Sequence, residues 1–200
     1  MNKKGMYQTI GTSISVVGFV LYVYYFVNVS THDNSYISDN LHRDYTFRFS
    51  VSFVLAVQNL LIILYFFKYR RVSLALCVTG ILFVGISQGG WCLLTIIYDM
   101  PWHMVGFSIF VSGVLVYWMI ILIIDKEQLV VDNKEYLIVL TSFTFCFLYS
   151  IFYVLYNNIS WLYEHIGMIF FNVALIYFFL HHDPDPLNTV YLDARVRPFV

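Results

Sequence analysis

The sequence predicts an all-α, polytopic membrane protein with six transmembrane helices and both termini in the cytosol. Apolar residues make up 60% of the chain and charged residues only 12%, which lies outside the range of ordinary soluble domains. Six apolar stretches are each about long enough to cross a bilayer, and none of them contains Lys or Arg. Nearly all the basic residues lie in segments that would share one side of the membrane.

The spans are taken in chain order from the apolar runs. Roughly 20 residues of helix cross a hydrocarbon core. The predicted spans are residues 9–27, 50–67, 72–98, 102–124, 137–156 and 161–180. Helices are favoured over barrel strands because these runs are continuously apolar and do not alternate.

Charge gives the orientation. Six spans place both termini on one side, and nine of the eleven Lys and Arg residues then lie in the cytosol. Only Arg43 and Arg48 remain outside, in a loop over residues 28–49. The chain divides into a cytosolic N-terminus (1–8), one membrane domain (9–180) and a cytosolic tail (181–200).

Loop lengths and small residues predict how the helices pack. The exterior turns 99–101 and 157–160 are short, so spans three and four, and spans five and six, should be antiparallel neighbours. Gly85 and Gly89 form a GxxxG pattern in span three, and Ser108 and Ser112 lie four apart in span four. We expect these small residues to let the two helices approach closely.

Composition also limits the partners and cofactors. The net charge of -1, without a basic stripe, argues against binding nucleic acid. Three cysteines, Cys77, Cys92 and Cys146, lie within spans and are expected to be free thiols. No cofactor motif is present. The two sequons at Asn28 and Asn158 lie directly beside the membrane, which disfavours glycosylation.

Ionisable side chains gather at the exterior ends of the spans, where phosphate and ester groups of lipids lie. Burying such groups is unfavourable, so each one suggests a function. His103 and Glu164 are the candidate catalytic residues, as a proton carrier and its partner. The candidate residues for binding a lipid head group are Arg48, Asp99, His165 and Asp39.

Helical spacing places His103 on one face with Gly106, Phe110, Gly113 and Tyr117, which would turn it inward. The simpler alternative is that charged residues occupy span ends because water is available there. A metal site built from His103, His165, Asp99 and Asp39 is a further alternative, although it lacks a tight ligand spacing. No nucleophile motif is present.

Several short motifs resemble those of a superfamily of six-span membrane proteins. Residues 35–39 (SYISD) resemble a loop motif of the damage-regulated autophagy modulators. Three other stretches are closer to the post-GPI attachment to proteins factor 2 family. These are residues 45–49 (YTFRF), the region from Cys92 to Phe107, and the region from Tyr156 to Glu164.

The resemblance implies a lumenal face that acts on or presents lipid, and remodelling of GPI-anchor fatty acids in the Golgi or endoplasmic reticulum. The family-like positions are Arg48, His103 and Glu164. The expected partners are membrane lipid and GPI-anchored proteins. The alternative is a non-enzymatic regulator of autophagy or membrane lipid homeostasis in the lysosome or plasma membrane.

Overall fold

A computed structural model describes residues 3–31, 35–70, 73–97, 99–127 and 160–181, with isolated helical positions at 141, 144, 145 and 148. The described residues are helical almost throughout. The elements are α1 (Lys3–Tyr25), η1 (Phe26–Ser30), α3 (Ile37–Arg43), α4 (Tyr45–Tyr69), α5 (Leu74–Ile96), α6 (Met100–Glu127) and α8 (Ser160–His181).

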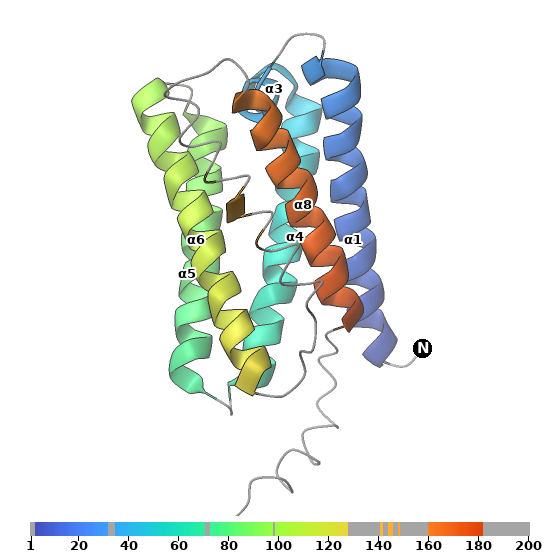
Figure 1. Cartoon of the computed structure of the whole chain (residues 1–200), viewed down its shortest axis with the longest axis vertical. Helices are drawn as coiled ribbons and strands as arrows, with labels where there is room; N and C mark the ends of the chain where they lie inside the picture. Colours follow the sequence, from blue (N-terminus) through green and yellow to red (C-terminus); the bar gives the residue numbers. More distant parts are fainter. Residues whose placement is uncertain are drawn as a thin grey trace, which may run out of the picture.

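Five helices of the described chain are long and apolar enough to cross a membrane, as expected of a helical multi-pass membrane protein. Four of the observed helical segments extend beyond the predicted spans at one or both ends. The third, α5, is shorter than its predicted span by two residues at each end. The predicted fifth span, 137–156, lies outside the described residues apart from the four isolated positions. α6 and α8 run in the same direction, and both begin at the same end of the bundle (Figure 1).

The segment 28–49, predicted as a loop, is mostly helical, so that prediction was wrong. A π-helical turn, η1, extends α1 as far as Ser30, and α3 follows. α4 begins at Tyr45, five residues before the predicted span, because the Asp44 side chain caps it and accepts a hydrogen bond from the Phe47 N–H at 3.1 Å. Hydropathy does not detect this polar first turn.

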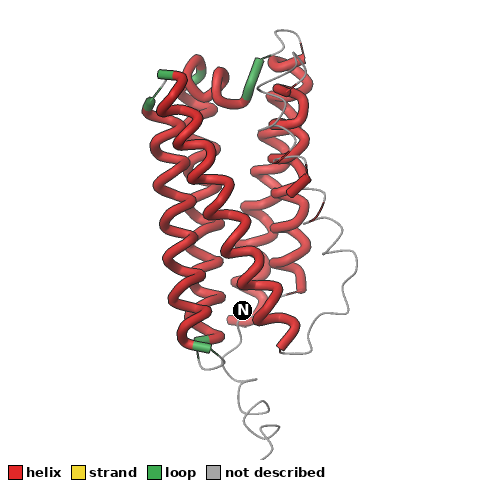
Figure 2. The backbone as a smooth tube through the Cα atoms, turned by 60° about the vertical axis from the view of Figure 1, so that its left-hand side comes forward, coloured by secondary structure: helices red, strands yellow, loops and turns green. Residues whose placement is uncertain are grey.

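The helices form two groups on either side of α4, with α5 and α6 on one side and α1 and α8 on the other (Figures 1 and 2). α4 presents one buried stripe at helical spacing, which includes Phe47, Val51, Val54 and Gln58. Deep polar side chains join the groups. Gln58 donates to Asn172 of α8 at 3.0 Å, and Asn59 donates to Gln88 of α5 at 2.7 Å.

α5 and α6 are antiparallel neighbours, which confirms the predicted pairing of spans three and four. The glycines that allow it are different from those expected. A Cβ at Gly90 would lie 2.3 Å from the Phe110 nitrogen, and one at Gly106 would lie 2.8 Å from the Leu94 nitrogen. By contrast, nothing lies within 4 Å of a Cβ at Gly85 or Gly89.

The predicted GxxxG contact was therefore wrong, because successive helical residues are rotated by about 100° and the packed face passes through position 90. Ser108 and Ser112 are exposed as well. The face that contains Gly106, Phe110, Gly113 and Tyr117 is buried, as the spacing predicts.

The two described cysteines, Cys77 and Cys92, are free thiols as predicted. Cys146 lies outside the described residues.

The packing predicts opposite effects for two adjacent glycines. Gly90→Ala should lower the thermal stability of the detergent-purified chain, because its methyl group would overlap backbone atoms of α6; overpacking of this kind costs about 1–3 kcal/mol. Gly89→Ala is the matched control and should leave the melting temperature unchanged or slightly raised, since alanine favours helix. Equal melting temperatures for the two variants would contradict this packing.

Candidate functional site

The short helix α3 lies across one end of the bundle, which we call the α3 end (Figure 1). Its first turn is capped by Asp39, whose carboxylate accepts a hydrogen bond from the Tyr36 N–H at 3.2 Å. Ile37 and Leu41 lie one turn apart and are both fully buried, so one face of α3 packs onto the bundle. A seven-residue helix is unstable in isolation. Tertiary contacts must therefore hold it in place.

One set of contacts joins α3 to η1. Asn40 donates from Nδ2 to the Ser30 hydroxyl at 2.8 Å and accepts from the Ser35 hydroxyl at 3.2 Å. All three side chains are buried, so each hydrogen bond satisfies a polar group that water cannot reach.

Glu164, the fifth residue of α8, makes the key contact between α3 and the transmembrane helices. Its Oε2 accepts a hydrogen bond from the Ile37 N–H at 3.1 Å, and the residue is only 8% exposed. Ile37 is the first residue of α3, so this carboxylate satisfies an amide that has no partner within the helix and lies at the positive end of the helix dipole.

His165 also packs against the segment that leads into α3. It is completely buried; its Nε2–H donates to the Ser35 carbonyl at 3.3 Å, while its Nδ1 has no hydrogen-bond partner among the described residues. The ring contacts those of Phe26 and Trp161, with centroids at 5.5 Å and 6.4 Å. A head-group contact through His165 would require the α3 segment to move.

His103 lies in the first turns of α6 and is half-buried. Its Nδ1–H donates to the Ile97 carbonyl at 3.3 Å, and its ring centroid lies 6.1 Å from that of His42 on α3. The structure therefore pairs His103 with a second imidazole. Burial lowers the pKa of His42, with a smaller contribution from His103, while a backbone hydrogen bond with Leu94 opposes the shift.

The remaining candidates lie at the same end in separate settings. The Arg48 guanidinium lies over the Tyr45 ring, 5.1 Å from its centroid. Asp99 is exposed, and its backbone carbonyl accepts a hydrogen bond from the His103 N–H. Asp39 is half-buried in the cap of α3.

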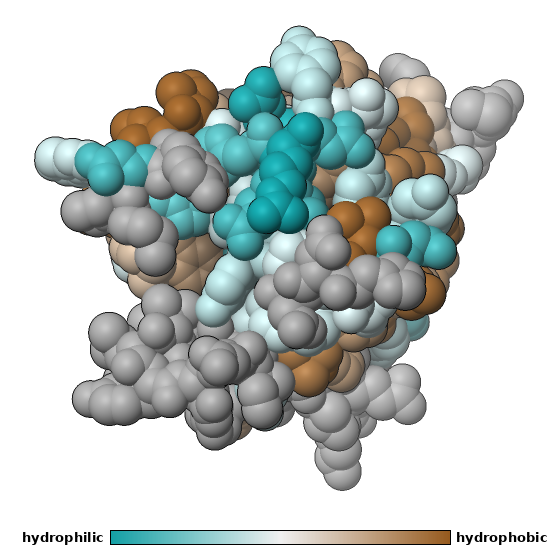
Figure 3. Space-filling view, turned by 90° about the horizontal axis from the view of Figure 1, so that it is seen from above, coloured by the Kyte–Doolittle hydropathy of each residue, from teal (hydrophilic) through white to brown (hydrophobic). Residues whose placement is uncertain are grey.

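His103, Glu164 and Arg48 were expected to gather in one pocket. Within the described ranges, no hydrogen bond, ion pair or ring contact joins any two of them. Each of the three side chains has another partner in its own surroundings, and their gathering in one pocket stays a prediction. The polar side chains do collect on this face, where hydrophilic residues extend across the centre and hydrophobic residues lie around them (Figure 3).

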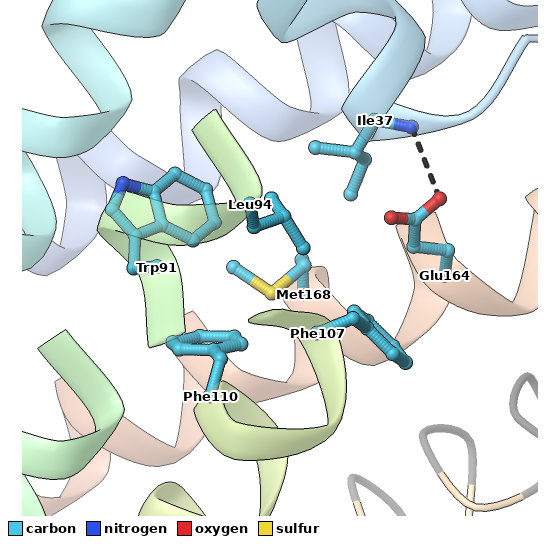
Figure 4. A pocket seen from close by; sticks show the side chains of 7 residues that line it. All are labelled: Ile37, Trp91, Leu94, Phe107, Phe110, Glu164 and Met168. Atoms are coloured by element: carbon cyan, nitrogen blue, oxygen red, sulfur yellow. Dashed lines mark hydrogen bonds between the residues drawn. The ribbon is translucent and has the colours of Figure 1, made fainter. Parts of the chain in front are cut away.

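A small cavity lies beneath α3, next to Glu164 (Figure 4). Apart from that carboxylate its lining is apolar and comes from α3, α5, α6 and α8: Ile37, Trp91, Leu94, Phe107, Phe110 and Met168. The enclosed space is about that of a water molecule, and a lipid head group does not fit in it as it stands.

No group of three His, Cys, Asp or Glu side chains in the described part of the chain has the arrangement of a metal site. The residues considered for a metal site from the sequence each have different contacts: His103, His165, Asp99 and Asp39.

The first sequon is poorly placed for glycosylation. Asn28 lies in η1 and its side chain donates to the Tyr24 carbonyl at 2.9 Å, while the sequon's Ser30 is completely buried. Acceptor sequons normally lie in accessible surface loops. Asn158 lies outside the described residues.

Sequence reasoning missed the residues that hold α3, above all Asn40, Ser30 and Ile37. One signal was available: the Asp at the third position after Tyr36, together with Ile37 and Leu41 one turn apart, is typical of a capped amphipathic helix.

Comparison of the chain with protein-family models, curated proteins and solved structures finds no match.

The role of Glu164 in anchoring α3 predicts a difference between two substitutions. Glu164→Ala leaves the Ile37 N–H buried without an acceptor, which costs about 1–3 kcal/mol and should speed tryptic cleavage after Arg43, an exposed residue of α3, by roughly tenfold. Glu164→Gln keeps an acceptor oxygen and should be cleaved at close to the original rate. Equal cleavage of both variants and the unaltered chain would show that the contact does not hold α3.

His42 predicts a pH effect on stability. Because its pKa in the folded chain lies below the ordinary 6.5, the unfolded chain binds the proton more readily. The contribution of His42 to the stability of the fold is therefore complete above about pH 6.5, and it is lost as the pH falls below that value. The melting temperature should drop between pH 7.5 and pH 5.5, and by less in His42→Gln. A drop of the same size in that variant would assign the effect to other groups.

Proposed function

We propose that this chain is a six-span membrane protein that acts on or presents lipid at its α3 end, with that end facing the lumen and both termini in the cytosol. The basic residues of the described chain support the orientation, since Arg43 and Arg48 are the only two of them at the α3 end. The others lie at the opposite ends of α1, α4 and α6: Lys3, Lys4, Lys68, Arg70 and Lys126. The start of α1 and the end of α8 are also adjacent, because Gln8 donates to the Leu180 carbonyl at 3.1 Å.

The observation that supports this function best is a buried carboxylate beside an apolar cavity at one end of the bundle. Glu164 is the fourth residue of the apolar segment Trp161–His181, at its α3 end, and the cavity beside it is lined from α3, α5, α6 and α8 (Figure 4). Ionisable groups at such positions are unfavourable unless they are paired, and they commonly mark functional sites.

We further propose remodelling of GPI-anchor fatty acids in the Golgi or endoplasmic reticulum as the specific process. This rests on the resemblance of residues 45–49 and of the stretches that contain His103 and Glu164 to the family of post-GPI attachment to proteins factor 2. In this scheme Arg48 holds a phosphate or carbonyl oxygen, His103 moves a proton, and Glu164 orients the head group. The imidazole of His42 lies beside that of His103, with ring centroids 6.1 Å apart.

A non-enzymatic regulator of autophagy or of lysosomal or plasma-membrane lipid is the second candidate. It is favoured by the hydrogen bond between Glu164 and Ile37, since a carboxylate occupied by the chain's own backbone has a structural role without any substrate. Such a regulator would depend on cytosolic segments more than on His103.

Retention of a GPI-anchored reporter at the surface of cells that lack the host remodelling factor tests the proposal. The unaltered chain should restore retention, and His103→Ala should lower it by at least about tenfold, since general acid–base groups contribute about 10²–10⁴-fold. Gly89→Ala is the control variant and should restore it fully.

Full activity of His103→Ala, or failure of the unaltered chain, would reject the remodelling role. Loss of function on truncation after residue 182, with correct membrane insertion, would favour the regulator.

A further inference from the structure

Ile37 contributes two different groups to the cavity beneath α3. Its backbone N–H donates to the Glu164 carboxylate at 3.1 Å, and its side chain, 2% exposed, forms part of the apolar lining (Figure 4). One residue therefore offers a hydrogen-bond donor next to a short aliphatic branch. A lipid with a hydroxyl or ammonium group near the start of its acyl chain has the same combination.

We propose that the cavity is the binding site for a lipid with a hydrogen-bond donor in its head group, and that Ile37 of α3 occupies that site in the resting chain. The donor of the lipid replaces the Ile37 N–H at Glu164, and its acyl chain replaces the Ile37 side chain among Leu94, Phe107 and Met168. This inference rests on the proposed lipid-facing function and specifies its ligand.

The lining of the cavity argues for a donor group and against a phosphate at this position. The Glu164 Oε2 atom is an acceptor in this structure, since the Ile37 N–H donates to it, so a donor is what can take the place of that amide. The oxygens of a phosphate diester only accept hydrogen bonds. No Lys, Arg or His side chain of the described chain lines the cavity with it. A phosphate of the same lipid would therefore lie farther out, toward the half-buried Arg48 and His103.

The construction of α3 allows it to be displaced. The helix has only seven residues, and it lies between Tyr36 and Asp44, which are both in extended conformations (φ −69°, ψ 157° and φ −114°, ψ 104°). Its polar contacts with α8 are the Ile37 N–H, which donates to Glu164, and the preceding Ser35 carbonyl, which accepts from His165. A ligand donor could replace the first of these. Because the closed cavity holds only about one water, an acyl chain enters only when Ile37 withdraws.

Photolabelling of the full chain in phosphatidylcholine nanodiscs tests the proposal. The probes are a diacylglycerol with a diazirine in its acyl chain and the matched methyl ether, which lacks the hydroxyl donor. Ile37→Ala opens the cavity and should raise labelling of Trp91, Phe107 and Met168 by the diacylglycerol at least about fivefold. Ile96→Ala removes an isoleucine that is 76% exposed on α5, and it should leave labelling unchanged.

The ratio of labelling by the diacylglycerol to labelling by its methyl ether tests whether Glu164 binds the hydroxyl of the lipid. In Ile37→Ala the diacylglycerol should label the cavity up to about tenfold more than its methyl ether, since a buried hydrogen bond is worth up to roughly that factor. Adding Glu164→Ala should reduce the ratio to about one. Adding Glu164→Gln, which keeps a neutral acceptor, should give an intermediate ratio and serves if the alanine variant does not fold.

Equal labelling by the two probes in Ile37→Ala, or no rise over the unaltered chain, would overturn the proposed site. If the probes label other residues at the α3 end and reporter retention persists, this inference fails while the lipid-facing function stands. If the α3 end takes up no label and retention is absent, both fail.

Discussion

The hydrogen bond between the Glu164 carboxylate and the first amide of α3 is the interaction on which the α3 end depends. It places an ionisable group where the helices leave the apolar core and gives it a partner at the positive end of a helix. Without that partner, two buried polar groups would be unsatisfied at once. With it, a helix too short to be stable alone closes the end of the bundle, and Ile37 and Leu41 are removed from water.

The transmembrane packing sets the position of this contact. The close approach of α5 and α6 at Gly90, Gly106 and Gly113 brings Leu94 and Phe107 together as one wall of the cavity. The antiparallel pairing of α1 with α8 is equally close, since a Cβ at Gly18 would lie 2.3 Å from Oδ1 of Asn172. These contacts hold α8 in the position from which Glu164 reaches α3. A shift of α8 along its axis would separate them.

The sequence predicted the helices better than their contacts. All five described spans coincide with apolar runs, because the hydropathy of a span is a property of each segment alone. α4 begins earlier than predicted because a single cap at Asp44 extends it, and hydropathy does not register a cap. Its carboxylate has a lowered pKa, chiefly because the Tyr25 hydroxyl and then the Phe47 N–H donate to it.

The sequence predicted polar residues at the span ends but not the contacts that they make. Polarity at the span ends located Glu164, His103 and Arg48, yet which atoms meet depends on helix rotation and on α3, which was predicted as loop. The GxxxG pattern failed for the same reason, because Gly89 and Gly90 are adjacent in sequence and face opposite surroundings. Pairings of this kind come from tertiary structure.

Amide hydrogen exchange of Ile37 in the unaltered chain, measured by NMR in lipid nanodiscs, tests this arrangement most directly. A hydrogen bond to a buried carboxylate should slow its exchange at least about a hundredfold relative to an unstructured amide. Exchange at the unstructured rate would contradict the account, since α3 would then not be held by Glu164.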